Sequence, residues 1–246
     1  MLTVDHNDLP LISGTTPIVD IGYTRMTMPG VFVAGCNFQC PYCINRELVI
    51  GPRPHEFNPS SVISTYMLSG EKWVMVSGAE ALLNEKTPNL LSHIKSLGMN
   101  VALATNGSLH GRLVDVVSHG LVDYVVMDIK TSFDLDKYRA VSGTSMSQDI
   151  LNDIVSSVDF LIERSSPYFG CEFRMTACSK YVDRQDAIEV AKYLEVPQTF
   201  VLQMFTTHQT LLESVAQQKY VISYDELLDW ADEIDQYVGK AFVREV

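Results

Sequence analysis

Three cysteines directly follow a short apolar run in the stretch Val31-Phe32-Val33-Ala34-Gly35-Cys36-Asn37-Phe38-Gln39-Cys40-Pro41-Tyr42-Cys43. The apolar run predicts a β-strand that ends just before the Cys-x3-Cys-x2-Cys array. Three thiolates in one tight loop can hold three irons of a [4Fe-4S] cluster and leave the fourth iron without a protein ligand. Clusters used only for electron transfer take four cysteines, so three cysteines indicate an exchangeable ligand and a site of chemistry.

Two other uses of the cysteines fit the sequence less well. A structural zinc site needs four ligands in closed geometry, yet His55 lies in a Pro-rich loop and Cys171 and Cys178 are far along the chain. Five cysteines are an odd number for a disulfide framework, and no signal peptide precedes them. Cys171 and Cys178 are most simply buried thiols.

Composition and charge favour a globular enzyme in a reducing, cytoplasmic compartment. The chain has 246 residues, 46% of them hydrophobic, which suits one α/β domain over residues 1–246. No apolar run approaches the ~20 residues that span a bilayer. The net charge of −12, without a Lys/Arg cluster, argues against a nucleic-acid partner. Oxygen-sensitive clusters and free thiols fit a reducing compartment.

Strand-like and helix-like segments alternate along the chain. Asn58 and Asp183 are suitable N-caps for two of the helices. Right-handed βα crossovers produce a parallel sheet with helices outside, and six units predict a partial (βα)6 TIM-like barrel. We expect a hairpin extension over residues 1–30, a barrel core over 31–204 and a helical extension over 205–246. The predicted strands are 31–35, 73–77, 100–104, 124–129, 171–177 and 199–204, and the predicted helices are 59–68, 88–97, 109–119, 150–164, 184–194 and 224–238.

Polar residues follow several of these strands, at the edge where a barrel of this kind carries its active site. Gly78 and Glu80 follow the second predicted strand, and Thr105-Asn106-Gly107 follows the third. Met127-Asp128-Ile129-Lys130 ends the fourth. Simpler explanations exist for each: Glu80 as a helix-start acid, Asn106-Gly107 as a turn, and Asp128 with Lys130 as an ion pair.

The segment 35–45 resembles the signature of the radical S-adenosylmethionine (SAM) enzymes, in which SAM chelates the open iron through its amino and carboxylate groups. The resemblance extends from about Gly22 to Met204 and is closest to the activating proteins of anaerobic ribonucleotide reductase. It implies a [4Fe-4S] cluster and S-adenosyl-L-methionine as cofactors. Residues implied to ligate the cluster are Cys36, Cys40 and Cys43, and residues implied to bind the cofactor are Tyr42, Asn45, Gly78, Glu80, Thr105, Asn106, Asp128, Lys130, Arg174 and His208.

Individual residues match the motifs of this family or depart from them. Glu80 matches the acid that receives the ammonium of SAM, although Ser77 and Ala81 replace a Gly and a Pro of that motif. Ala104 stands where related activases have Asp. Tyr42 occupies the position that packs on adenine, or it is a loop-packing aromatic. A lone Arg or His at a strand end is often a local hydrogen-bonder, which remains the alternative for Arg174 and His208.

Three functions follow from the resemblance. The first is an anaerobic oxidoreductase that cleaves SAM reductively to a 5′-deoxyadenosyl radical. This radical takes a hydrogen atom from a glycine of a glycyl radical enzyme. A flavodoxin- or ferredoxin-type protein would supply the electron for the cleavage. Many other glycyl-radical activases insert a cysteine-rich segment soon after the cluster loop, and none lies between Cys43 and Glu80. The second is a stand-alone radical SAM enzyme for a small molecule, nucleotide or peptide. The third is a degenerate barrel that carries electrons or binds a partner.

Overall fold

The computed structural model describes residues 8–22, 26–51, 56–143, 146–166, 169–208 and 210–245. His55 and parts of the predicted N-terminal hairpin, residues 1–7 and 23–25, lie outside the described residues. No helix within the described ranges is both long and apolar enough to cross a membrane.

The described chain forms one eight-stranded sheet in which each strand pairs with the next in sequence. β1 (Gly14–Ile21) pairs antiparallel with β2 (Met26–Val33), and all later pairings are parallel. The parallel strands after β2 are β3 (Trp73–Gly78), β4 (Asn100–Thr105), β5 (Tyr124–Asp128), β6 (Gly170–Ala177), β7 (Thr199–Met204) and β8 (Lys240–Arg244).

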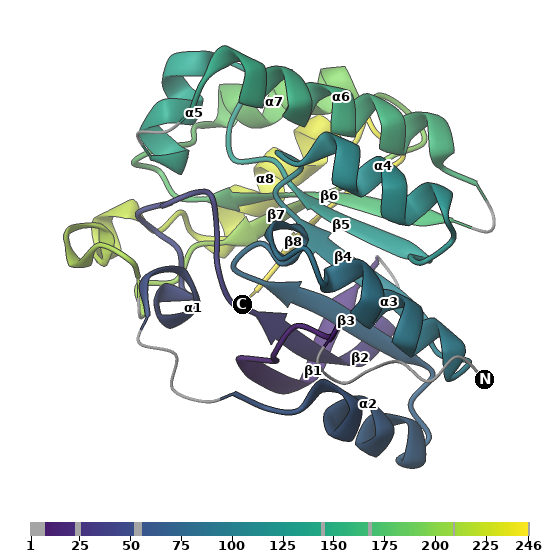
Figure 1. Ribbon diagram of the computed structural model, residues 1–246. Coiled ribbons are helices and arrows are strands. Elements are labelled where there is room, and N and C mark those ends of the chain that lie inside the picture. Colours follow the sequence, from purple (N-terminus) through teal and green to yellow (C-terminus); the bar gives the residue numbers. More distant parts are fainter. Residues whose placement is uncertain are drawn as a thin grey trace.

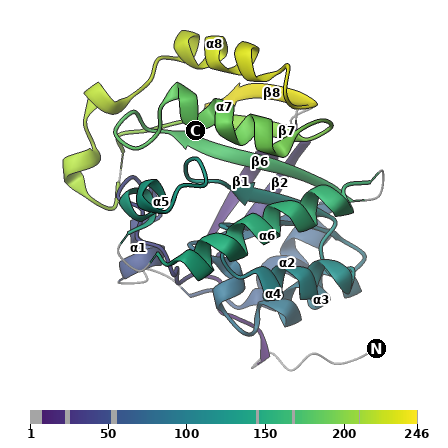
Figure 2. The same ribbon diagram turned by 90° about the horizontal axis from the view of Figure 1, so that it is seen from above.

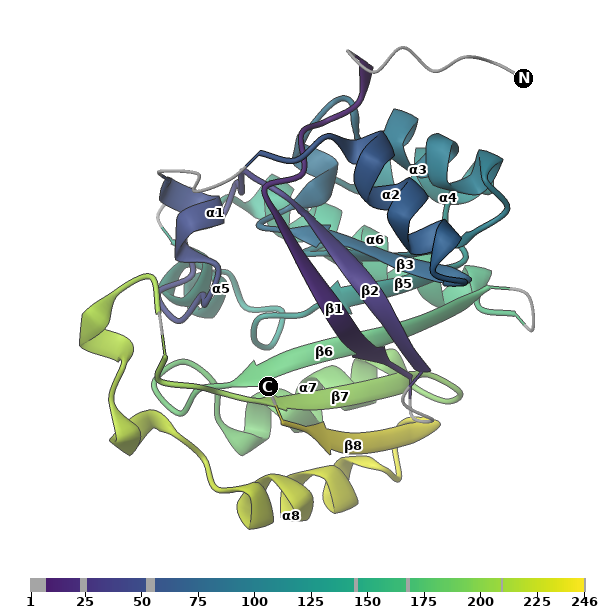
Figure 3. The ribbon, with the colours of Figure 1, turned by 90° about the horizontal axis from the view of Figure 1, so that it is seen from below.

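Helices fill the crossovers between the parallel strands and lie on the outer side of the curved sheet (Figure 1, Figure 2). Seen from below, β1 and β2 cross in front of other strands of the sheet, and α6 and α7 lie behind it (Figure 3). This arrangement confirms the predicted partial TIM-like barrel. The helices are α1 (Arg46–Ile50), α2 (Pro59–Leu68), α3 (Thr87–Ser96), α4 (His110–Ser118), α5 (Leu135–Ser142), α6 (Gln148–Arg164), α7 (Arg184–Leu194) and α8 (Tyr224–Ile234).

Local capping explains why two helices begin where the sequence predicts. The Asn58 side chain accepts a hydrogen bond from the Ser61 amide, and Pro59 occupies the first turn of α2. Asp183 and Asp186 form a reciprocal capping box at the start of α7. These side chains satisfy amides that would otherwise have no partner at the helix start.

The structure differs from the prediction at both ends of the chain. β2 begins at Met26, so the first parallel strand is itself the second strand of the hairpin predicted over 1–30. The predicted helix 224–238 ends at Ile234, because β8 follows at Lys240 and pairs with β7. The segment predicted as a helical extension therefore adds a strand to the sheet.

The two faces of the sheet have different cores. The outer face carries Val74, Val76, Val101 and Leu103, which pack in the main core with the helices. Residues between them point inward, because side chains alternate along a strand. The inner core is small: Ile21, Met28, Met75, Ala102 and Val126. Beyond these residues, toward the carboxyl ends of the strands, this apolar cluster does not continue along the inner face.

A buried carboxylate on β6 connects the end of β1 to β6 and β8. Glu172 on β6 is fully buried and accepts hydrogen bonds from the Gly22 amide at 2.7 Å and from Arg174 Nε at 2.8 Å. Arg244 on β8 donates to the same carboxylate at 2.8 Å and to the Gly22 carbonyl at 3.3 Å. We call this cluster of Gly22, Glu172, Arg174 and Arg244 the clasp, because it closes the open side of the half-barrel.

The charge of Glu172 depends on the clasp. Burial alone would raise the pKa of Glu172, but the neighbouring charges of Arg174 and Arg244 outweigh it and hold the pKa below its usual value. Stability gained from this depressed pKa is present above the unfolded pKa of about 4.3 and is lost as pH falls through the folded value.

Glu172→Gln should lower the free energy of unfolding by about 3 kcal/mol at neutral pH, because it leaves two partly buried arginines without a counter-charge. Urea unfolding of the wild type and the variant should give curves that converge as pH falls below about 4. The exposed Glu163→Gln change serves as control. An equal loss of stability at every pH would contradict this role of the ionised carboxylate.

Candidate active site

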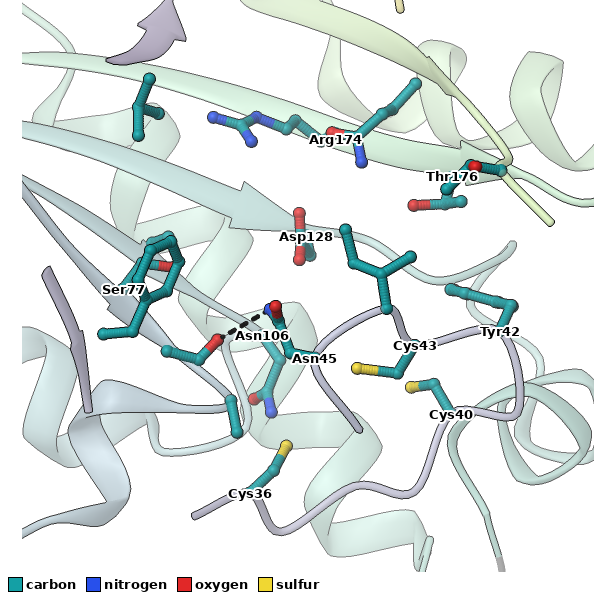
Figure 4. Close-up of a pocket in the computed structure, with 18 of the residues that line it drawn as sticks. Cys36, Cys40, Tyr42, Cys43, Asn45, Ser77, Asn106, Asp128, Arg174 and Thr176 are labelled. Carbon is teal, nitrogen blue, oxygen red and sulfur yellow. Dashed lines mark hydrogen bonds between the residues drawn. The ribbon is translucent and has the colours of Figure 1, made fainter. Parts of the chain in front are cut away.

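A cavity of about 470 Å³ opens on the inner face, at the carboxyl ends of the parallel strands (Figure 4). Its walls come from the cysteine loop after β2, from the ends of β3 to β8 and from β1. Such a volume is typical of small-molecule and cofactor sites. The predicted site residues that line it are Cys36, Cys40, Tyr42, Cys43, Asn45, Gly78, Thr105, Asn106, Asp128, Lys130 and Arg174.

The strand pleat explains the polarity of this wall. Met75 and Ser77 point to the inner face of β3, and Val126 and Asp128 do so on β5. On both of these strands the inward residue is apolar nearer the start and polar at the end. The cavity is therefore the continuation of the inner core, with space and polar groups in place of apolar side chains.

The three cysteines of the array are free thiols that reach one space. Figure 4 shows the sulfur atoms of Cys36, Cys40 and Cys43 pointing into the same cavity. Burial raises the pKa of Cys36 to about 11 and that of Cys40 to about 12, and it also raises the pKa of Cys43. Thiolates are the usual ligands of iron–sulfur clusters, so this donor set suits a cluster, which would displace the thiol protons on binding.

A single metal ion fits this geometry less well than a cluster does. Among the residues that the structure describes, no three His, Cys, Asp or Glu side chains converge on the position of one ion. In a cubic cluster each thiolate binds a different iron. The three cysteines of a cluster site can therefore lie farther apart than the ligands of a single metal ion. Cys171 and Cys178 are buried elsewhere, and Cys171 donates to Gln198 Oε1 at 3.5 Å.

Backbone hydrogen bonds fix the cysteine loop to the surrounding structure. The Gly35 amide donates to the Leu48 carbonyl of α1 at 2.9 Å, and the Gln39 amide donates to the Ser142 carbonyl of α5 at 2.8 Å. Both helices are short, and neither was predicted from the sequence. They supply the carbonyl groups that hold the loop from two sides.

Asn45 connects the cysteine loop to the end of β3. Its side-chain amide donates to the Gly78 carbonyl at 3.4 Å (Figure 4). Gly78 has φ of 153°, and a Cβ there would lie 2.0 Å from the Val33 carbonyl oxygen. Glycine is therefore required for the close approach of β3 to β2, and the backbone it approaches is that of Val33.

Glu80 lies behind the cavity wall and does not line it. Its buried carboxylate accepts from the Asn106 amide at 2.7 Å, Thr105 Oγ1 at 3.0 Å and the Leu82 amide at 3.1 Å. The Glu80 amide donates to the Gly35 carbonyl at 2.8 Å. Burial raises the pKa of Glu80 to about 7, although the three accepted hydrogen bonds act in the opposite direction.

Asn106 extends this network toward the cysteines. Its side-chain amide donates to Asn37 Oδ1 at 3.0 Å, and the Asn37 amide group donates to Ser108 Oγ at 2.7 Å. Thr105 and Asn106 line the cavity as well. The Thr105-Asn106-Gly107 turn is thus both a turn and part of the wall.

Asp128 and Lys130 form an ion pair that lines the cavity. Lys130 Nζ lies 3.0 Å from Asp128 Oδ2. Burial alone would lower the pKa of Lys130, but the Asp128 charge outweighs it and raises the pKa well above its usual value. Because the pair faces the cavity, it can also contact a bound anion through the lysine.

Tyr42 and Arg174 reach the cavity, and each carries a buried polar atom with no hydrogen-bond partner: Tyr42 Oη and Arg174 Nη2. His208 is exposed beyond β7 and does not line the cavity; its amide donates to Thr206 Oγ1 at 3.3 Å.

Three acidic and basic residues of this region were not predicted as site residues: Asp20, Glu172 and Arg244. Asp20 and Arg244 line the cavity, and Glu172 holds Arg174 by the Nε hydrogen bond. The alternation of Glu172 and Arg174 on one strand face was a usable signal, because residues two apart share a face. Asp20 and Arg244 reach the cavity only because β1 pairs with β2 and β8 pairs with β7.

The sequence model of the radical SAM superfamily matches residues 31–154, half of the chain. The chain belongs to the radical SAM superfamily. Enzymes of this superfamily use a [4Fe-4S] cluster and SAM, and the three thiols and the adjoining cavity described above fit that pair of cofactors. The chain is thus a radical SAM enzyme.

Curated relatives resemble this radical SAM chain at low identity. A Methanocaldococcus jannaschii protein provisionally named a glycyl-radical enzyme activating enzyme is 26% identical over 196 residues, which cover 79% of this chain and 80% of that protein. A second protein of that organism with the same provisional name is 24% identical over 65% of this chain and 60% of its own length. The GTP 3′,8-cyclase of Marinobacter nauticus is 21% identical over 75% of this chain and 54% of the cyclase.

Solved structures share the fold of this radical SAM chain. Streptococcus suis SuiB bound to S-adenosylmethionine superposes with a TM-score of 0.61 at 12% identity, covering 85% of this chain and 48% of SuiB. TYW1 with a lysine-pyruvate adduct bound gives a TM-score of 0.57 at 17% identity, covering 85% of this chain and 72% of TYW1. At these identities the likeness concerns the fold.

Glu80→Gln should lower the free energy of unfolding by about 1 to 3 kcal/mol, because a side-chain amide presents a donor where three donors already converge. Urea unfolding measures this loss, and equilibrium dialysis measures SAM binding by the reconstituted protein. Asp134→Asn, a similar change at the exposed cap of α5, is the control. Unchanged stability together with weakened SAM binding would instead support direct contact between Glu80 and the SAM ammonium.

Proposed function

We propose that this radical SAM enzyme activates a partner glycyl radical enzyme, of the anaerobic ribonucleotide reductase type, by removing a hydrogen atom from one glycine. The observation that carries this proposal is the relative from M. jannaschii with the provisional activating-enzyme name, which aligns over about four fifths of both chains. The sequence between Cys43 and Glu80 contains no further cysteine, as expected for activases of the reductase or formate-lyase type.

The cysteine loop holds the cluster in this proposal. Cys36, Cys40 and Cys43 each supply one thiolate, and the fourth iron remains open to SAM. When bound, the cluster and SAM together supply the one-electron cleavage that yields a 5′-deoxyadenosyl radical. The protein binds and orients the cofactors and keeps water away. Buried Phe38 and Tyr42 beside the thiols contribute to that exclusion.

The remaining wall residues bind SAM. Asn45, Gly78, Thr105 and Asn106 present amide and hydroxyl groups beside the cysteines. The Lys130 ammonium offers a cation to the carboxylate of SAM, and its pairing with Asp128 keeps it charged. Tyr42 offers a ring for adenine and a hydroxyl without an internal partner. Arg174 faces the same cavity from β6.

An external protein must deliver the electron, and we propose a flavodoxin- or ferredoxin-type donor. The cysteine loop is the point of entry, since Cys36 and Cys43 are only half-buried. The partner's glycine loop approaches from the cavity opening. Its entry requires docking of the two proteins, so short peptides are expected to be poor substrates.

A second function is a stand-alone radical SAM enzyme that modifies a small molecule, nucleotide or peptide. The alignment with a GTP 3′,8-cyclase favours it, although that alignment covers only 54% of the cyclase. The two functions differ in the hydrogen donor: a protein-bound glycine in the first and a free molecule in the second.

Replacing Cys36, Cys40 or Cys43 with Ala should abolish the brown absorption of the [4Fe-4S] cluster after anaerobic reconstitution, because no other cysteine reaches the cavity. Iron and sulfide analysis measures the loss. Cys171→Ala and Cys178→Ala are the matched controls and should retain full iron. A Cys40→Ala protein that loads a full complement of iron would disprove the ligand assignment.

Anaerobic incubation of the wild-type protein with reductant, SAM and the ribonucleotide reductase of the same source should produce the EPR doublet of a glycyl radical. The doublet should disappear when the reductase's radical glycine is replaced by Ala. Rapid SAM cleavage without the reductase, accompanied by modification of an added metabolite, would favour the stand-alone enzyme and contradict the activase.

A further inference from the structure

The cysteine loop has a side that faces away from the cavity. Its three thiols point into the cavity, where SAM and the substrate bind in the proposed function (Figure 4). A donor protein that approached through the cavity opening would compete with the substrate. Electron transfer also weakens steeply with distance, so a donor must dock where the protein layer over the loop is thin. We therefore searched the outer side of the loop for a docking surface.

Two segments far along the chain lie against this outer side. The Leu212 amide donates to the Pro41 carbonyl of the cysteine loop at 3.0 Å. The Ser179 amide donates to the Tyr220 carbonyl at 3.0 Å, which joins the turn after β6 to the segment before α8. This segment, drawn in yellow-green, passes beside α1 and the cysteine loop in Figure 1 and Figure 3. Together the two segments form one surface over the loop.

Two aromatic rings connect this surface to the thiols. Tyr42 is buried and lies in sequence between Cys40 and Cys43. Its ring centre lies 6.0 Å from that of Tyr181, and the two ring planes are tilted by 54°. Tyr181 is half-buried, so part of it reaches solvent. The layer between solvent and the loop is thus two contacting rings thick at this point.

Two exposed lysines surround the outer ring. Lys180 Nζ lies 5.4 Å from the centre of the Tyr181 ring and 5.5 Å from that of Tyr220. Lys219 Nζ lies 4.9 Å from the centre of the Tyr220 ring. Because both ammonium groups lie close to one ring, they are separated by about one Debye length at most and repel each other. We call Lys180, Tyr181, Lys219 and Tyr220 the lysine–tyrosine patch.

The lysine–tyrosine patch is positive in a chain whose net charge is −12. In the part of the chain that the structure describes, neither patch lysine has an ion-pair partner, whereas Lys95 and Lys137 each pair with an aspartate. Residues 178–182 and 210–222, which carry the patch, contain one acid, Glu213. Two uncompensated like charges on an acidic protein favour an anionic partner at this place.

The other side of the cysteine loop is less suited to such a partner. The opening beside α1 is lined by Arg46, Glu47 and Glu213, whose charges sum to a negative value. An acidic protein would be repelled there and attracted at the patch. The charge pattern around the loop therefore selects one side for docking.

We propose that the lysine–tyrosine patch is the docking surface of the electron-donor protein, and that this donor carries acidic side chains around its redox group. The inference rests on the external donor of the proposed function. The lysines attract and orient the donor, and the contact of Tyr181 with Tyr42 places the donor over the loop between Cys40 and Cys43. One electron passes from the donor, which is oxidised, to the cluster, which is reduced. No bond forms or breaks at the patch, and no proton moves.

The test separates docking from radical chemistry. Reduced flavodoxin of negative net charge is mixed with the reconstituted, SAM-loaded protein, and stopped-flow absorbance of the flavin gives the second-order rate constant of electron transfer. Isothermal titration calorimetry gives the Kd of oxidised flavodoxin, for the protein with and without its cluster. Reduced methyl viologen, a small cation that needs no docking surface, is the second reductant for SAM cleavage.

The variants reverse the patch charges singly and together, as Lys180→Glu, Lys219→Glu and the double change. Lys192→Glu is the matched control, because Lys192 is an exposed lysine whose Nζ lies 5.1 Å from the ring centre of Tyr237. It lies in the last turn of α7, whereas the patch precedes the first turn of that helix.

Each single reversal should lower the rate constant and raise the Kd about fivefold or more, because it removes one attraction and adds one repulsion. The double variant should also lose most of the salt dependence that the wild type shows. The Lys192→Glu protein should match the wild type within about twofold. SAM cleavage with methyl viologen should be equal in all these proteins, because none of the substituted side chains lines the cavity.

Equal rate constants for the wild type and the double variant would overturn the inference. A loss of SAM cleavage with both reductants would overturn it as well and assign the lysines to the structure of the loop. Normal electron transfer with a weakened Kd for the reductase would assign the patch to the glycyl radical enzyme instead. A wild type that neither flavodoxin nor ferredoxin reduces would contradict both the patch and the proposed donor.

Methyl viologen tests the activase function independently of the patch. If the viologen-reduced wild type yields no glycyl radical on the reductase, the proposed activation is wrong. Dependence of flavodoxin electron transfer on Lys180 and Lys219 in that same protein would still support the docking surface.

Discussion

The carboxylate of Glu80 is the constraint on which the site depends. It accepts hydrogen bonds from Leu82, Thr105 and Asn106, while its amide donates to Gly35 at the start of the cysteine loop. These hydrogen bonds thereby fix the ends of β2, β3 and β4 relative to one another. A carboxylate that faces only donors suits this position, because a neutral side chain could not accept from all of them.

The alternation of side chains along the strands creates a cavity at this edge of the sheet. The same alternation that sends Val101 and Leu103 outward to the helices sends Ala102 and Ala104 inward. Small inward residues on β4 leave space, and polar inward residues on β5 and β6 line it. A closed barrel would fill this volume with layers of side chains. The partial barrel keeps it open and closes its lateral side with the clasp.

Local signals predicted much of the fold, whereas tertiary pairing determined the rest. The bounds of α2 and α7 follow from Pro59 and from the Asp183 capping box, and the cysteine loop follows from its spacing. β8 is short and lies directly after α8, so its pairing with β7 has no local signature. Glu80 and His208 stand outside the cavity lining because position in sequence does not fix the direction of a side chain.

The clasp links the stability of the sheet to the wall of the cavity. Glu172 closes the half-barrel through Gly22 and Arg244 and at the same time fixes Arg174, whose Nη2 remains without an internal partner. An unpaired buried group costs free energy, so an arrangement that served stability alone would also have given this nitrogen a partner. The clasp instead holds the Arg174 guanidinium against the cavity with one donor unused. A donor held in this way needs no reorganisation when a ligand arrives, so binding energy is conserved for orientation.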